Sequence, residues 1–126
     1  MSQPFLAAGF AETFGTGAEE LFAGWTVAAE KTETQRMPAG ELHTARLTLE
    51  KDGREIRAEV TDYEPALFTA LPGNGQAIEG VGVRLARDTE TGELAAAYPR
   101  GSLYIVLRGN MAEKDFTSAI RELVRP

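Results

Sequence analysis

The sequence predicts an α+β fold in which one antiparallel β-sheet of about six strands carries a C-terminal helix packed on it. Three patterns support this prediction. Two alternating apolar runs flank Asp52-Gly53, an almost unbroken apolar run covers residues 103–107, and apolar side chains recur at helical spacing near the C-terminus. The expected order is helix, three strands, short helix, three strands, helix.

The chain begins with a predicted short helix. Leu6, Phe10 and Phe14 recur at every fourth position and therefore share one helical face. Glycines interrupt this pattern, and a further helical turn is expected over residues 18–22. Residues 25–30 then alternate in polarity, which is typical of a half-buried strand.

Residues 42–62 give the clearest local prediction, a β-hairpin closed by Asp52-Gly53. This dipeptide favours the two-residue turn whose central residues both need positive φ. Pairing outward from that turn places every apolar partner on one face of the sheet. The apolar set is Ala45, Leu47, Leu49, Ile56, Ala58 and Val60, and the opposite face carries Arg46, Thr48, Arg57 and Glu59.

The second half of the chain repeats this alternation of strands and turns. Asp62 is expected to cap a short helix over residues 62–71. A second hairpin follows, with strands near residues 81–85 and 94–98 and a four-residue turn in which Gly92 is left-handed. The run 103–107 predicts the middle strand of the sheet, and a capping-box pattern over residues 110–113 starts the last helix.

Composition limits the class of protein. A chain of 126 residues fits one domain, residues 1–126, and its 43% hydrophobic and 25% charged residues are typical of a globular protein. The formal net charge of -6 argues against nucleic-acid partners, because the mean field repels phosphate. The absence of cysteine excludes disulfides, thiolate nucleophiles and cysteine zinc sites.

The sequence leaves the cellular compartment open. No apolar run approaches the roughly 20 residues of a membrane helix. The first residues lack the basic region and the long apolar stretch of a signal peptide. We therefore expect no transmembrane segment, with a periplasmic location if an export signal has been removed and a cytoplasmic one otherwise.

His43 is the only histidine, and the hairpin register places it opposite Asp62 at the open end of the apolar face. A histidine with a carboxylate partner is half of a catalytic triad. The chain has no Gly-x-Ser-x-Gly elbow to supply the nucleophile, so we assign no catalytic residue. The pair His43 and Asp62 is interpreted as a structural polar pair or a helix cap.

No metal or cofactor is predicted. Asp88, Glu90 and Glu93 suggest calcium, but glycine stands at the fifth position of this loop, whereas an EF-hand loop needs it at the sixth. The loop is therefore interpreted as a solvated turn. The glycine-rich stretches 73–75 and 80–82 lack the strand before and the helix after that a dinucleotide site requires.

Aromatic residues concentrate near the start of the chain. Their commoner use is packing against the protein's own sheet. Because an end segment is displaced at the cost of few contacts, part of this stretch is also a candidate interface. The candidate interface residues are Phe5, Phe10 and Phe14.

The stretch from Gly101 to Met111, GSLYIVLRGNM, is followed by Glu113, Asp115 and Phe116. It resembles the ending of several small bacterial envelope proteins, in which a central strand leads through a glycine into an acidic-capped terminal helix. The element order is also similar to that of PsbP-like and DcrB-like domains, whose curved antiparallel sheet carries helices. This resemblance implies an accessory or binding role and assigns no functional residue.

The sequence therefore predicts a non-enzymatic binding or accessory domain that contacts a protein partner or a second copy of itself. The first alternative is a carrier that holds a small apolar ligand between sheet and helices, and the second is a hydrolase-type enzyme that uses His43. A pocket of roughly a few hundred Å³ lined by apolar side chains would favour the carrier. A filled core with an exposed patch would favour the binding domain.

Overall fold

In the computed structural model, the described residues are 10–38, 40–62, 76–78, 83–88 and 90–124. They form a seven-stranded sheet and three helices. The helices are α2 (Phe10–Phe14), α3 (Ala18–Leu21) and α5 (Glu113–Val124). The strands are β1 (Thr26–Met37), β2 (Gly40–Lys51), β3 (Arg54–Thr61), β4 (Gln76–Ile78), β5 (Val83–Arg87), β6 (Leu94–Arg100) and β7 (Leu103–Gly109).

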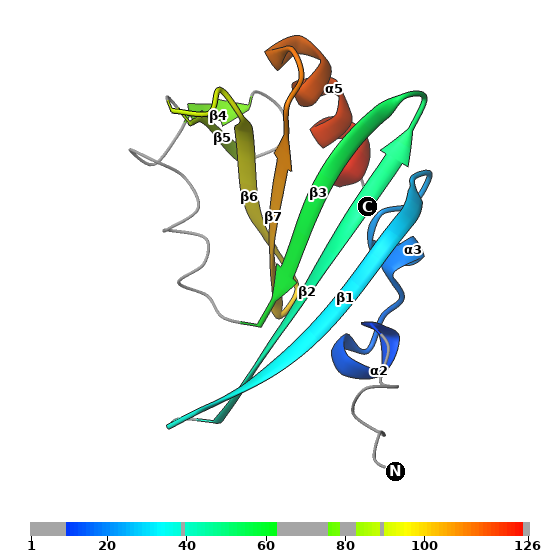
Figure 1. Ribbon diagram of the computed structural model, residues 1–126, viewed down its shortest axis with the longest axis vertical. Coiled ribbons are helices and arrows are strands. Elements are labelled where there is room, and N and C mark those ends of the chain that lie inside the picture. Colours follow the sequence, from blue (N-terminus) through cyan, green and yellow to red (C-terminus); the bar gives the residue numbers. More distant parts are fainter. Residues whose placement is uncertain (1–9, 39, 63–75, 79–82, 89, 125–126) are drawn as a thin grey trace.

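The sheet has the order β1-β2-β3-β7-β6-β5-β4, and each neighbouring pair is antiparallel (Figure 1). The predicted α+β class with a C-terminal helix is therefore confirmed. The short strand β4, which pairs with β5, was not predicted. The helix predicted for residues 62–71 lies, after Asp62, outside the described residues.

The first hairpin has the predicted register. Lys51 faces Arg54 across the turn, and the pairing continues without a shift to Thr44 and Thr61. Asp52 and Gly53 have φ values of 51° and 79°, as the two-residue turn requires. The predicted apolar set is buried along its whole length. Local turn chemistry and the alternation of side chains thus determine this hairpin.

The second hairpin and the middle strand also match the prediction. Gly92 has a φ of 77°, and the Asp88 N–H donates to the Glu93 carbonyl at 2.8 Å across the four-residue turn. Strand β7 lies between β3 and β6 in the middle of the sheet. Its apolar run fits this position because Ile105 and Leu107 are buried in the core, and Val106 is buried in a small cluster with Ala95 and Ala97.

Strand β1 differs from the prediction in length and in its alternation. It continues to Met37, and its register against β2 shifts between Val27 and Ala29. Such a bulge moves the following side chains to the opposite face of the sheet. Val27 packs against the core, whereas Ala29 is exposed.

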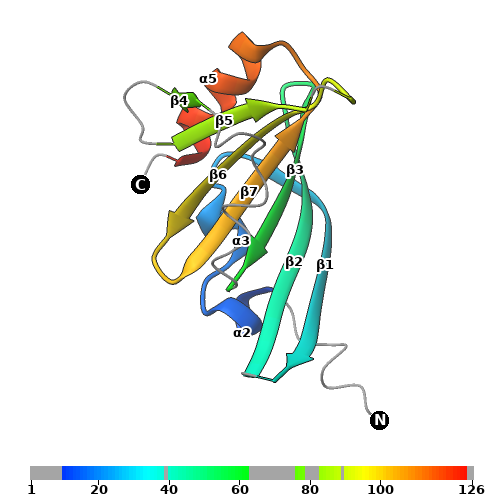
Figure 2. The same cartoon turned by 90° about the vertical axis from the view of Figure 1, so that its left-hand side faces the viewer.

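The hydrophobic core lies between the helices and one face of the sheet, here called the inner face. Side chains of α2, α3 and α5 belong to the same buried cluster as the apolar residues of the first hairpin. Figure 2 shows these helices on the far side of the sheet, so that the face that none of the described helices covers, here called the outer face, points to the viewer. The largest fully buried side chains include Phe22, Phe116, Leu49, Ile56, Ile105 and Ile120.

A charged cluster joins α5 to the turn of the first hairpin. Glu122 accepts a hydrogen bond from Lys51 at 2.7 Å and one from Arg54 at 3.4 Å. The hydrogen bond from Lys51, together with the two nearby positive charges, lowers the pKa of Glu122. The Arg54 guanidinium also lies 5.0 Å from the centroid of the Trp25 ring. These contacts hold α5 against the turn of the first hairpin.

None of the described helices is long and apolar enough to cross a membrane.

Candidate functional site

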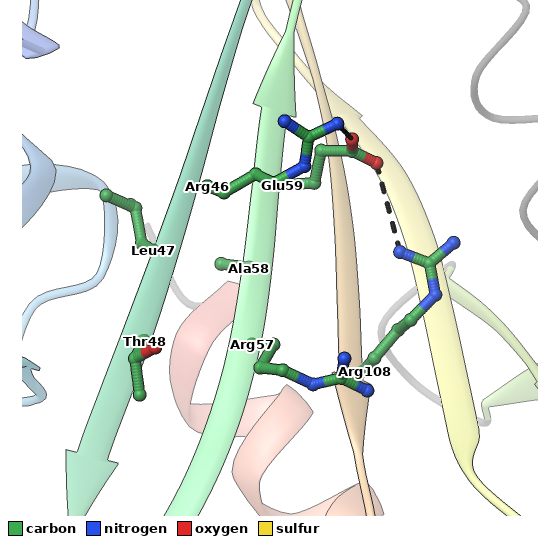
Figure 3. A pocket seen from close by; sticks show the side chains of 7 residues that line it. All are labelled: Arg46, Leu47, Thr48, Arg57, Ala58, Glu59 and Arg108. Atoms are coloured by element: carbon green, nitrogen blue, oxygen red, sulfur yellow. Dashed lines mark ion pairs between the residues drawn. The ribbon is translucent and has the colours of Figure 1, made fainter. Parts of the chain in front are cut away.

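A hollow of about 210 Å³ opens on the outer face of the sheet. It lies over β2, β3 and β7, and Figure 3 shows the side chains around it. Its lining consists of Arg46, Leu47, Thr48, Arg57, Ala58, Glu59 and Arg108.

The register of the sheet explains why these charges meet. Arg46 of β2 is the direct cross-strand partner of Glu59 on β3, an opposite-charge pair. Arg57 of β3, by contrast, is the direct cross-strand partner of Arg108 on β7. Like charges directly opposite one another destabilise an antiparallel pair. The two arginine side chains therefore leave the sheet from directly opposite positions, and Figure 3 shows the Arg108 guanidinium extended toward Glu59.

Three carboxylates contact the three arginines of the hollow, and the contacts are unequal. The Glu59 carboxylate lies between two of these arginines (Figure 3). Its Oε2 is 3.6 Å from Nη2 of Arg46, and its Oε1 is 3.8 Å from Nη1 of Arg108. Arg46 also pairs with Glu33, and Arg57 pairs with Glu93. Among the contacts of the described residues, Arg108 has only the loose contact with Glu59.

The guanidinium groups remain accessible to solvent. The side chains of Arg46, Arg57 and Arg108 are 59%, 58% and 35% exposed. Ion pairs between exposed side chains contribute about 0–1 kcal/mol, so an incoming anion displaces them at small cost. A planar guanidinium group binds a carboxylate or a phosphate through two parallel hydrogen bonds. The hollow is thus suited to binding an anionic group.

His43 and Asp62 lie in contact, as the predicted register requires. His43 Nδ1 is 2.7 Å from Asp62 Oδ2, and the His43 N–H donates to Asp62 Oδ1 at 2.9 Å. The other ring nitrogen, Nε2, is 3.6 Å from a carboxylate oxygen of Glu41. Both ring nitrogens therefore face carboxylates, whereas the histidine of a catalytic triad directs one of them at a nucleophilic hydroxyl.

The pKa of Asp62 is below its ordinary value. Partial burial raises this pKa, but the hydrogen bonds from the ring and the backbone of His43, together with the charge of the imidazolium form, lower it by more. A carboxyl group whose pKa is lower in the folded state stabilises the fold above the unfolded-state pKa near 3.8. That contribution is lost as the pH falls through the lower, folded-state pKa.

We expect His43→Ala to lower the free energy of unfolding by about 0.5–1 kcal/mol at neutral pH, because one partly exposed hydrogen bond to a carboxylate is lost. The difference from the wild type should disappear as the pH falls through the folded-state pKa of Asp62. Urea unfolding at a series of pH values measures both effects. A cost that persists at the acidic end would show that the imidazole stabilises the fold through packing instead of through Asp62.

The acidic loop after β5 is held by hydrogen bonds within the loop. Asp88 Oδ1 accepts hydrogen bonds from the backbone N–H groups of Glu90 at 2.8 Å and Thr91 at 3.2 Å. The third acidic side chain, Glu93, pairs with Arg57 at the hollow. Within the described part of the chain, no group of three or more histidine, aspartate or glutamate side chains is arranged to hold a metal ion.

The N-terminal aromatic residues pack against the body of the protein. Phe10 is buried in the core, and the Phe14 ring, half-buried, lies with its centroid 4.8 Å from that of Phe10. Phe5, the third candidate interface residue, lies outside the described residues. The Phe10 ring is consequently covered, and the exposed residues at the start of α2 are Ala11 and Glu12.

Sequence reasoning placed Arg46, Arg57 and Glu59 on one face but did not connect them with Arg108. That connection depends on the pairing of β3 with β7, two strands far apart in the sequence. In the sequence, the alternation of Tyr104, Val106 and Arg108 indicates only that these three side chains share one face of the predicted middle strand.

Comparison of the chain with protein-family models, with curated proteins and with solved structures found no match.

Proposed function

We propose that this protein is a non-enzymatic binding domain whose outer-face hollow holds one or two carboxylates of a protein partner. The observation that supports this most directly is the placement of Arg57 and Arg108 as direct cross-strand partners at the hollow. An anion bound between them would relieve the repulsion of the like charges and form charge-assisted hydrogen bonds with both.

The size and the lining of the hollow favour this function over a carrier. Pockets for drug-sized ligands have volumes of about 300–1,000 Å³ and mostly apolar linings. This hollow has about 210 Å³, below that range, and the charged groups in its lining are three guanidinium groups and a carboxylate. It is therefore matched to one or two side chains of a peptide segment.

The charge of the whole chain favours a short acidic segment over a long polyanion. The net charge of -6 repels a nucleic acid along its full length. A segment with one or two carboxylates interacts mainly with charges within a Debye length of about 8–10 Å, which include the three arginines of the hollow. The partner is thus expected to present isolated acidic side chains or a chain terminus.

We expect a hexapeptide with two adjacent glutamates to bind at the hollow and its glutamine counterpart to bind more weakly. NMR titration should show the shifts concentrated at the side-chain N–H groups of Arg57 and Arg108. Arg57→Gln and Arg108→Gln should each raise the peptide dissociation constant about tenfold, because each removes a charge-assisted hydrogen bond.

Arg36→Gln is the matched control, since it removes the same charge from an exposed position of β1 that does not line the hollow. Its peptide affinity should equal that of the wild type. Equal binding of the glutamate and glutamine peptides would contradict the proposal. Binding of a single-stranded DNA oligomer with a steep salt dependence that Arg57→Gln abolishes would instead assign the hollow to nucleic acid.

A further inference from the structure

Strand β1 forms one edge of the sheet. It is twelve residues long, it pairs with β2 on one side, and no described strand pairs with its other side (Figure 2). Residues 33–36 are exposed, and so are residues 28–31. A long exposed edge of this kind offers backbone N–H and C=O groups to a further strand.

The backbone hydrogen bonds show which groups of β1 point outward. In an antiparallel sheet, a residue directs its N–H and C=O to one neighbouring strand, and the next residue directs them to the other. The Asp62 N–H donates to the His43 carbonyl at 3.3 Å, so the odd-numbered residues of β2 are directed to β3. The even-numbered residues of β2 are therefore directed to β1.

The same alternation applies to β1. The even-numbered residues Thr44 and Arg46 of β2 are the cross-strand partners of Glu33 and Lys31. Those two residues of β1 are consequently directed inward, to β2. Thr32, between them, directs its N–H and C=O to the open edge, as do the other even-numbered residues of this segment.

One charged side chain at this edge, Lys31, has no oppositely charged partner among the described residues. Lys31 lies directly opposite Arg46, which is a like-charge pair, and it forms no ion pair with a described residue. Glu33, two residues along on the same face, pairs with Arg46. An additional carboxylate beside Lys31 would therefore relieve a local excess of positive charge.

A second copy of this chain would supply that carboxylate. If two β1 strands pair antiparallel with Thr32 opposite Thr32 of the second copy, each Lys31 faces Glu33 of the other copy. These pairs fall at the non-hydrogen-bonded positions, where side chains approach most closely. Shifting the pairing by two residues in either direction places Glu33 opposite Glu33 or Lys31 opposite Lys31. Of these three registers, only the first places opposite charges face to face.

We propose that the open edge of β1 pairs in this register with β1 of a second copy, forming a continuous sheet across a two-fold axis. Because that axis is perpendicular to the sheet, the outer faces of both copies lie on the same side. The two arginine-lined hollows then share one surface, on which a partner with two acidic segments binds both at once and gains affinity by multivalency. The dimer itself does not depend on what the hollows bind.

Charged side chains and bulges on edge strands also protect monomers from pairing. The bulge of β1 lies between Val27 and Ala29, before the residues from Lys31 to Glu33 whose charges meet in the dimer. The charges in that segment alternate in sign and are self-complementary instead of uniformly repulsive. These two features distinguish β1 from an edge strand whose charges and bulges serve only to prevent pairing with another chain.

Sedimentation equilibrium of charge variants tests the interface. Lys31→Glu and Glu33→Lys should each raise the dimer dissociation constant about tenfold or more, because each places two like-charged pairs across the axis. An equimolar mixture of the two variants should form heterodimers, since the acidic side chains of one then face the basic side chains of the other. The double variant Lys31→Glu/Glu33→Lys should dimerise like the wild type. A wild-type chain that remains monomeric, or single variants that dimerise unchanged, would overturn the proposal.

Hydrogen exchange tests the register independently. The amides of Thr32 and Thr34 should become protected as the protein concentration rises, whereas those of Lys31 and Glu33 should be protected at every concentration. Thr34→Pro should weaken the dimer, since it removes an N–H at the open edge without removing a bond to β2. Thr34→Ala, which keeps that N–H, is the control. Exchange at Thr32 and Thr34 that is independent of concentration would rule out this interface.

Discussion

Phe116→Ala should lower the free energy of unfolding by about 3–5 kcal/mol, the usual cost of removing a buried phenylalanine side chain. Phe116 is fully buried on the side of α5 that faces the sheet. A Cβ atom added at Gly109 would lie 3.1 Å from two atoms of its ring, which shows how closely the ring packs on β7. So tight a site cannot easily collapse to fill the cavity.

Urea unfolding of the variant measures this effect. The matched control is Lys114→Ala, which changes an exposed residue of the same helix and should alter stability by no more than about 0.5 kcal/mol. A cost for Phe116→Ala below about 1 kcal/mol would mean that α5 contributes little to the cooperative core.

Phe22→Ala should have an effect of similar size, about 3–5 kcal/mol. Phe22 is fully buried directly after α3, and its backbone is held on both sides. Its N–H donates to the Ala18 carbonyl at 3.0 Å, and its own carbonyl accepts from the Trp25 N–H at 3.1 Å. The side chain is thus a fixed part of the core.

The comparison with Phe14→Ala tests whether the N-terminal segment belongs to the folded core. Phe14 is only half-buried, so its replacement should cost about 1–2 kcal/mol. Differential scanning calorimetry of both variants should show one transition that shifts further for Phe22→Ala. A separate low-temperature transition in the wild type would show instead that α2 and α3 unfold independently of the sheet.

Patterns within short stretches of the chain predicted the parts of the fold that depend on local physics. The Asp52-Gly53 turn fixed the register of the first hairpin, and this register puts every apolar side chain on one face, which a shift of one residue would not do. The same register brought His43 to Asp62. The start of α5 was less accurate, since the Phe116 N–H donates to the Ala112 carbonyl and the helix begins at Glu113, later than the capping-box pattern at residue 110 indicates.

The sequence by itself determined the α+β class, the two hairpins and the middle strand, because side-chain alternation and turn residues act between neighbours in the chain. Only the tertiary structure decided that β1 is an edge strand, that Phe10 faces the core, and that Arg108 joins Arg57. Each of these depends on which strands pair across long loops and on which face the helices cover. The alternation of side chains along one strand is the same whichever strand lies beside it. The candidate site therefore became visible only when β3 and β7 were paired.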